Sequence, residues 1–197
     1  MKKVILIGDS IRLGYCGFVK ALLADSTAVF YPEENCRFSQ NILVGLSEWM
    51  NLGGDPAGVD LVHWNCGHWD MARWRGEAKP LNSPAYYGEM LRRIDGHLRV
   101  CFPNAKIIFA LTTPMNPDGL TSANVRTTEN VRIYNAIACT VMNELGVPIN
   151  DLFSLMEKAP SSRYADYCHF TEDGYRMLAK QVAETIRTEC CTTISEL

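Results

Sequence analysis

Two periodicities alternate along the chain, and this alternation limits the possible folds more than any other feature of the sequence. Short runs with strand character recur between longer segments in which apolar residues are spaced as in an amphipathic helix. The expected strands are Val4–Ile7, Thr27–Tyr31, Leu61–Trp64, Lys106–Leu111 and Val147–Ile149. The expected helices are Gly17–Ala24, Asn41–Met50, Ala85–Val100, Thr128–Leu145 and Thr171–Glu189. Strands joined by helical crossovers predict a mostly parallel sheet.

A parallel sheet must be covered on both faces, so the alternation predicts a doubly wound, three-layer α/β/α sandwich. We expect the common flavodoxin-like strand order 2-1-3-4-5. A length of 197 residues without an internal repeat or linker indicates a single domain over residues 1–197. The longest irregular segments are Asn51–Asp60, Met71–Asn82 and Thr112–Thr127. Such loops usually form the site in this architecture.

Charge and composition narrow the class of ligand. The formal net charge is −3 and the chain has no basic run, so we expect neither a nucleic-acid nor a membrane partner, but a small polar molecule. The apolar run after Met1 is too short for a signal-peptide core, which indicates a cytoplasmic location. Eight cysteines without C-x-x-C spacing are expected to be reduced thiols.

The first expected strand breaks abruptly into Gly8, Asp9 and Ser10. In open α/β sheets, ligands bind beyond the carboxyl ends of the strands, at the crevice where the strand order reverses. In the expected order, the first and third strands flank this crevice, so Ser10 would face the segment Asn65–Asp70. The alternative is that Asp9 or Ser10 only caps the following helix, a role that both residue types fill well.

A D-x-x-H sequence, Asp166 to His169, lies immediately before the last expected helix and at the same edge of the sheet. A serine hydroxyl needs an imidazole to take its proton, and a carboxylate to fix the imidazole tautomer. In a tight turn, Asp166 can reach one ring nitrogen of His169 while the other points toward the crevice. The alternatives are a structural turn or a pair of metal ligands.

Other candidates cluster after the third strand. The side-chain amide of Asn65 suits an oxyanion donor, although a loop Asn often only bonds its own turn. His68 and Trp69 are the better ligand candidates of this segment, because aromatic faces suit sugar rings. His63 and His68 lack an H-E-x-x-H context, so we expect no metal and no cofactor. Arg12 either contacts the substrate or is an exposed residue at the helix start.

These residues resemble the SGNH or GDSL-type hydrolases. Gly8-Asp9-Ser10-Ile11 looks like the first block of that family, and Asp166-x-x-His169 looks like the last. The resemblance implies that Ser10 is the nucleophile, Asp166 the acid and His169 the general base. No G-x-S-x-G sequence, the pattern of the α/β-hydrolases, is present.

Two blocks depart from the pattern of the family. The third normally reads G-x-N-D, whereas here Asn65 precedes Gly67. The oxyanion donor of this block is therefore either Asn65 or a backbone amide near Gly67. The second block normally offers a glycine amide, and Asn35 to Arg37 are the candidates in a segment without glycine.

The joint pattern predicts a serine esterase that acts on a small-molecule ester through an acyl-enzyme intermediate. The first candidate substrate is an acetyl ester of a polar carrier such as a carbohydrate. Acyl transfer to another hydroxyl would use the same three residues. The alternative from a different class is a non-catalytic, flavodoxin-like binding module in which Ser10 caps a helix.

Overall fold

The computed structural model describes residues 1–119 and 123–191. Five parallel strands form the main sheet, in the spatial order β2-β1-β3-β5-β7. In chain order they are β1 (Lys2–Ile7), β2 (Thr27–Phe30), β3 (Leu61–Trp64), β5 (Lys106–Ala110) and β7 (Ile149–Asn150). Counted along the chain, this is the order 2-1-3-4-5, so the predicted fold class and strand order are confirmed.

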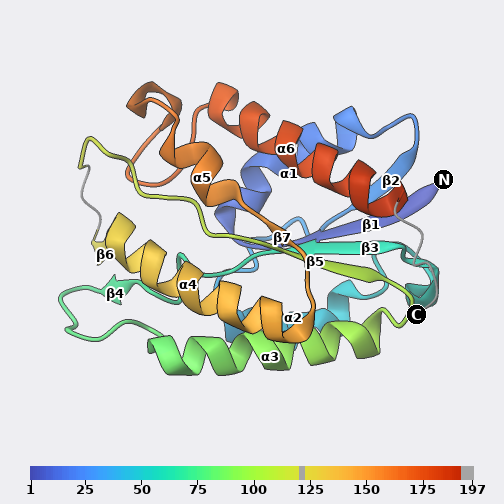
Figure 1. Ribbon diagram of the computed structural model, residues 1–197, viewed down its shortest axis with the longest axis horizontal. Coiled ribbons are helices and arrows are strands. Elements are labelled where there is room, and N and C mark those ends of the chain that lie inside the picture. The colour runs from blue at the N-terminus through green and yellow to red at the C-terminus, as the bar shows by residue number, and fades with distance from the viewer. Residues whose placement is uncertain (120–122, 192–197) are drawn as a thin grey trace.

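Helices cover both faces of the sheet (Figure 1). One layer contains α1 (Ser10–Leu22), α5 (Leu152–Glu157) and α6 (Glu172–Cys191). The other contains α2 (Ser39–Trp49), α3 (Pro84–Cys101) and α4 (Thr128–Leu145). Short 3₁₀ turns lie at Pro56–Gly58 and Ser161–Arg163. None of the described helices is both long and apolar enough to cross a membrane.

Side chains that alternate along the central strands build two separate cores. In β1, Ile5 and Ile7 pack into the core beneath α2, α3 and α4, whereas Val4 and Leu6 pack into the core beneath α1 and α6. All four side chains are fully buried. Because a central parallel strand has no solvent-facing side, β1 is apolar at every position from Val4 to Ile7, after two lysines at its outer end.

Local signals set several helix ends. The Ser83 hydroxyl accepts from the Tyr86 amide at the start of α3, and Thr127 and Asn130 form a capping box at α4. Gly146 ends α4 with a φ of 66°. Most elements begin and end within two residues of the expected positions, including β7, which begins at Ile149 instead of Val147.

The predicted start of the first helix, Gly17, is wrong. The helix begins at Ser10, because the Asp9 carboxylate accepts from the Ile11 amide at 3.0 Å and caps it directly after β1. Packing against α6 then stabilises this extra length, since the buried face of α1 includes Ile11 and Tyr15.

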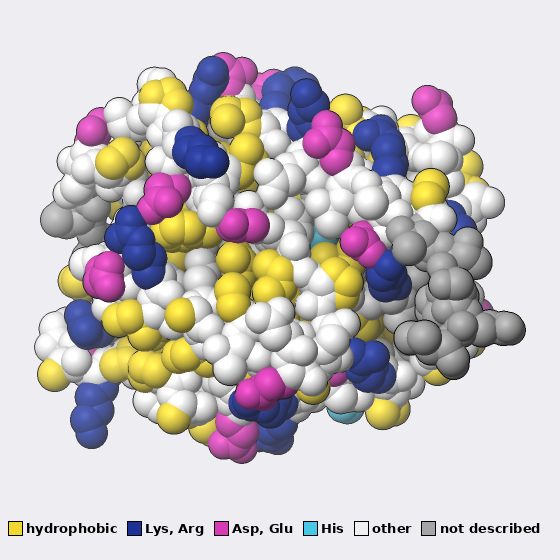
Figure 2. Space-filling model, viewed as in Figure 1, with side chains coloured by type: hydrophobic (Ala, Val, Ile, Leu, Met, Phe, Trp, Pro, Cys, Tyr) yellow, Lys and Arg dark blue, Asp and Glu magenta, His cyan; other side chains and the backbone are white. Residues whose placement is uncertain are grey.

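Two segments expected to be irregular contain a small ribbon. Strands β4 (Arg73–Trp74) and β6 (Asn124–Val125) pair antiparallel, apart from the main sheet (Figure 1). The helix α5 was also not expected. On the face shown in Figure 2, basic and acidic side chains are interspersed around apolar ones.

Candidate active site

At the carboxyl edge of the sheet, a chain of hydrogen bonds joins a residue of the first helix to a turn near the end of the sequence. Ser10 Oγ lies 2.8 Å from Nε2 of His169, and Nδ1 of the same ring lies 2.7 Å from Asp166 Oδ2. Ser10 is the first residue of α1, and the other two lie in the turn before α6. The fold therefore brings together the three residues that sequence analysis selected.

Backbone groups hold the Asp166 carboxylate in place. Its Oδ1 accepts from the amides of Cys168 at 2.8 Å and His169 at 2.7 Å, which leaves Oδ2 for the imidazole. Partial burial raises the pKa of Asp166, but these donors outweigh it and hold the pKa below its usual value. Asn116 fixes the turn from outside, because its side chain donates to the Asp166 carbonyl at 2.9 Å.

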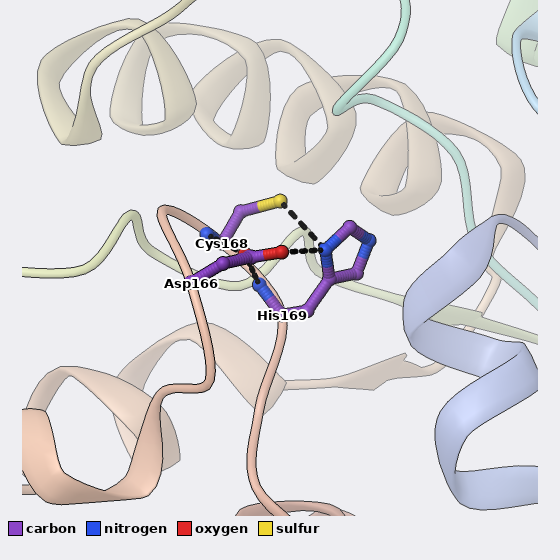
Figure 3. Close-up of side chains that lie close together, drawn as sticks. All are labelled: Asp166, Cys168 and His169. Carbon is purple, nitrogen blue, oxygen red and sulfur yellow. Dashed lines mark hydrogen bonds and ion pairs between the residues drawn. The ribbon is translucent and has the colours of Figure 1, made fainter. Parts of the chain in front are cut away.

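Sequence analysis did not single out Cys168 in this turn or Arg126, which lies between β6 and α4 and contacts the turn. Cys168 Sγ lies 3.8 Å from Nδ1 of His169, and Arg126 Nη2 donates to the same sulfur at 3.3 Å. Arg126 also stacks over the Tyr167 ring. The Cys168 sulfur and the Asp166 carboxylate together raise the pKa of His169 to about 9, against the effect of burial. Figure 3 shows the Cys168 sulfur and the Asp166 carboxylate directed at the same ring nitrogen of His169.

The nucleophile side of the site is buried. Asp9 caps α1 and also accepts from Asn65 Nδ2 at 3.1 Å. Burial raises the pKa of Asp9, while the hydrogen bonds from Asn65 and Ile11 oppose that effect. A Cβ at position 8 would lie 2.0 Å from Asn65 Oδ1, so only glycine allows the amide of Asn65 to approach the start of α1 this closely.

Neither expectation for Arg12 is correct, because its side chain is fully buried. The guanidinium donates to the carbonyls of Pro32 at 2.6 Å, Glu34 at 2.6 Å and Gly8 at 3.2 Å. Pro32 and Glu34 follow β2, far from Arg12 in sequence, whereas Gly8 lies one helical turn before it. Arg12 therefore ties the segment after β2 to the first turn of α1 and does not reach a substrate.

The segment after β2 contains the three candidate amides of the second block, those of Asn35, Cys36 and Arg37. Arg37 has a φ of 55°, in the left-handed region that favours glycine. Its amide donates to Asn35 Oδ1 at 2.8 Å, and the Cys36 amide donates to the Gly8 carbonyl at 3.1 Å. Two of the three candidate amides thus already have acceptors within the protein.

The segment after β3 contains three further candidates, Gly67, His68 and Trp69, which differ in exposure. His68 is buried, with Nε2 3.2 Å from Thr113 Oγ1, and burial together with Arg126 and His169 lowers its pKa well below the usual value. Gly67 has a φ of 148° and packs against Thr112. Trp69 is only half-buried, and its ring stacks at a tilt on Trp74 of the ribbon, with centroids 5.2 Å apart.

Metal-ligating side chains gather at one place in the described part of the chain. Ligand atoms of Asp166, Cys168 and His169 all lie within 4.8 Å of one another. His63 and His68 do not share a site, since the His63 ring hydrogen-bonds Asn150 and packs beside Tyr15.

Known proteins resemble this chain in sequence and in fold. GDSL esterase/lipase WDL1 of Oryza sativa subsp. japonica is 22% identical over 111 residues, which are 51% of this chain and less than half, 43%, of that protein. The crystal structure of an acetyl xylan esterase, AlAXEase, is 13% identical with a TM-score of 0.73, over 93% of this chain and 99% of that one. Est24, a carbohydrate acetylesterase from Sinorhizobium meliloti, is 12% identical with a TM-score of 0.73, over 95% and 99%.

At these identities the solved structures show a shared fold. The family itself is shown by a sequence model, that of the GDSL-like Lipase/Acylhydrolase family, which matches residues 6–177. That range begins within β1, before Ser10, and ends within α6, after His169. The chain therefore belongs to the GDSL-like lipase/acylhydrolase family of carboxylic ester hydrolases.

Proposed function

We propose that this protein is a serine esterase that removes small acyl groups, acetate first, from a polar carrier such as a carbohydrate. The observation that carries the proposal is the hydrogen-bonded chain from Ser10 through His169 to Asp166. The same geometry argues against a binding module in which Ser10 only caps a helix. Asp9 supplies the cap, and the Ser10 hydroxyl is bonded to the imidazole instead.

The reaction follows from this order of groups. Ser10 Oγ attacks the ester carbonyl while His169 Nε2 takes its proton, and Asp166 holds the proton on Nδ1 and stabilises the imidazolium. Collapse of the tetrahedral intermediate returns the proton from His169 to the leaving alcohol. Water, activated by His169 in the same way, then hydrolyses the acyl-Ser10 ester and releases the acid.

Donors for the oxyanion lie beside the nucleophile. Ser10 is the first residue of α1, where the helix leaves backbone N–H groups without intrahelical acceptors and carries a partial positive charge. The Asn65 amide nitrogen carries two hydrogens, and Asp9 takes one of them. We assign the second hydrogen to the oxyanion, with Asp9 holding the amide in position.

Two observations support an acylated carbohydrate as substrate. AlAXEase is described as an acetyl xylan esterase and Est24 as a carbohydrate acetylesterase, and both share this fold. In addition, the half-buried pair Trp69 and Trp74 offers aromatic surface next to the segment that contains Asn65.

Transfer of the acyl group to a second hydroxyl would use the same three residues. The products of the reaction in water distinguish this transfer from hydrolysis.

Labelling with a fluorophosphonate, followed by peptide mass spectrometry, tests for the activated serine without knowledge of the substrate. We expect modification of Ser10 alone, because among the serines that the structure describes it is the one hydrogen-bonded to the base. Ser10→Ala should abolish labelling, and Ser47→Ala, at an exposed serine of α2, should leave it unchanged. An unlabelled wild-type protein, or label spread over several serines, would refute the proposal.

A further inference from the structure

The proposed reaction leaves one side chain of the turn unused. Cys168 Sγ lies 3.8 Å from Nδ1 of His169, the same nitrogen that Asp166 Oδ2 approaches at 2.7 Å (Figure 3). A carboxylate oxygen, a sulfur and an imidazole nitrogen therefore converge on one point, all within 4.8 Å of one another. Acid–base catalysis needs the oxygen and the nitrogen, but not the sulfur.

We propose that Asp166, Cys168 and His169 form an inhibitory site for a borderline-soft divalent metal ion of the Zn²⁺ class. That such an ion switches off catalysis rests on the esterase function proposed above, whereas the binding site itself does not. Cysteine, histidine and carboxylate are the ligands that Zn²⁺ prefers, and hard ions such as Mg²⁺ avoid sulfur.

The distances suit a tetrahedral ion. Ligand atoms about 2.0–2.3 Å from one tetrahedral Zn²⁺ lie roughly 3.3–3.6 Å from each other. The observed separation of 3.8 Å between Cys168 Sγ and His169 Nδ1 is close to this range. Asp166 Oδ2 and His169 Nδ1 lie at the hydrogen-bond distance of 2.7 Å, and this distance would have to increase by a few tenths of an ångström. Water would complete the coordination.

The surrounding contacts orient the three ligands. Asp166 Oδ1 accepts from two backbone amides, which directs Oδ2 toward the site, and Ser10 engages the far ring nitrogen of His169. Such outer contacts position the ligands in metal proteins. Cys168 is buried, but 43% of the Asp166 side chain and 31% of the His169 side chain are exposed, so an ion can approach from solvent.

The local charges predict reversible binding. A Cys168 thiolate and the Asp166 carboxylate would neutralise a divalent ion. Arg126, whose guanidinium lies 3.3 Å from the sulfur, repels the ion. With three protein ligands and a nearby cation, the site should bind more weakly than a four-ligand structural zinc site, and a chelator should empty it.

Metal binding would disable the base by fixing the wrong tautomer. The ion takes the place of the proton on Nδ1 of His169, which the imidazolium releases to solvent, so the neutral ring keeps its remaining proton on Nε2. Nε2–H then donates to Ser10 Oγ and cannot accept the hydroxyl proton. The Cys168 thiol releases its proton to solvent, and no group is oxidised or reduced. Asp166, now a ligand, no longer orients the ring.

Titration with Co²⁺, followed by absorption spectroscopy, tests the site independently of activity. The wild-type protein should show a thiolate-to-cobalt charge-transfer band that Zn²⁺ displaces and Mg²⁺ does not. Cys168→Ser should lose this band. The matched control is the double variant Cys190→Ser/Cys191→Ser, which removes the adjacent thiols at the end of α6 and should keep it. A band that survives in Cys168→Ser, or disappears in the control, would overturn the site.

Inhibition by Zn²⁺ tests whether the bound ion switches off catalysis. The substrate is 4-nitrophenyl acetate, and each variant is compared with its own metal-free rate. Cys168→Ser should need at least about tenfold more Zn²⁺ for half inhibition, and a chelator should restore the wild-type rate. Equal sensitivity of both proteins would refute the switch. If fluorophosphonate fails to label the metal-free protein, the esterase proposal fails, while the cobalt band still decides the metal site.

Discussion

The two sides of the candidate site are built differently. On the nucleophile side, Asp9 and Arg12 are fully buried and Asn65 is 5% exposed, and side chains from distant segments bond one another there. On the base side, Asp166 and His169 lie on a short turn and keep 43% and 31% of their side chains exposed. Backbone amides of the turn hold the carboxylate. Changes on the nucleophile side should therefore reduce both stability and rate, and changes on the base side mainly the rate.

The largest effect is expected on the base side. Asp166→Asn should lower kcat by up to about four orders of magnitude with KM and Tm nearly unchanged, because the amide favours the wrong imidazole tautomer. Asp173→Asn, at an exposed carboxylate of α6 that pairs with Arg163, is the matched control and should keep its activity. A kcat close to wild type in Asp166→Asn would mean that Asp166 has only a structural role.

The next effect concerns Asn65 on the nucleophile side. If its amide donates to the oxyanion, Asn65→Ala should cost about a hundredfold to a thousandfold in kcat, with KM little changed. Asn65→Asp should be at least as damaging, since a carboxylate repels the developing charge and faces the buried Asp9. If Asn65 only shapes the turn after β3, Tm should drop but kcat should fall less than about tenfold. Melting curves and kinetics of the same samples decide between these results.

Arg12 provides a test of stability on the same side. Arg12→Met should lower the free energy of unfolding by roughly 1–3 kcal/mol, because the buried carbonyl of Pro32 and the partly buried carbonyl of Glu34 lose their donor. Urea unfolding measures this change. Arg176→Met on the exposed side of α6 is the control, and it should change the stability little. An unchanged unfolding midpoint in Arg12→Met would show that water replaces the guanidinium and that the two sides do not differ as argued.

Sequence patterns predicted what local interactions determine. The helix Thr128–Leu145 was predicted to the residue, because its last turn ends at Gly146 and a capping box precedes it. The strand order predicted that Ser10 faces the segment Asn65–Asp70, since the carboxyl ends of parallel strands share one edge, and the D-x-x-H turn was expected at that edge because it lies directly before the last helix. The roles of these residues remain predictions until the variants are measured.

Contacts between distant segments were not predictable. Arg12 looked like a surface residue because two of its three carbonyl acceptors lie in a distant segment, after β2. The ribbon pairs Trp74 with Asn124, and strands of two residues leave no periodicity in the sequence. Cys168 was noted only as one thiol among eight, because nothing in its neighbours indicates the 3.8 Å approach to His169.

The pH dependence of the rate tests the base side of the site. His169 must be neutral to accept the Ser10 proton, and its pKa is raised to about 9 by the Cys168 sulfur and the Asp166 carboxylate. The ratio kcat/KM, measured with EDTA present, should therefore rise with pH along an acid limb near 9 and fall about tenfold per unit below it. Cys168→Ala removes the sulfur and should move this limb toward the usual histidine pKa near 6.5, so activity at neutral pH increases while the plateau stays similar. Cys139→Ala, in the opposite helix layer, should not move the limb. If the limb of Cys168→Ala coincides with that of the wild type, the sulfur does not act on the imidazole, and Asp166 alone sets the protonation of the base.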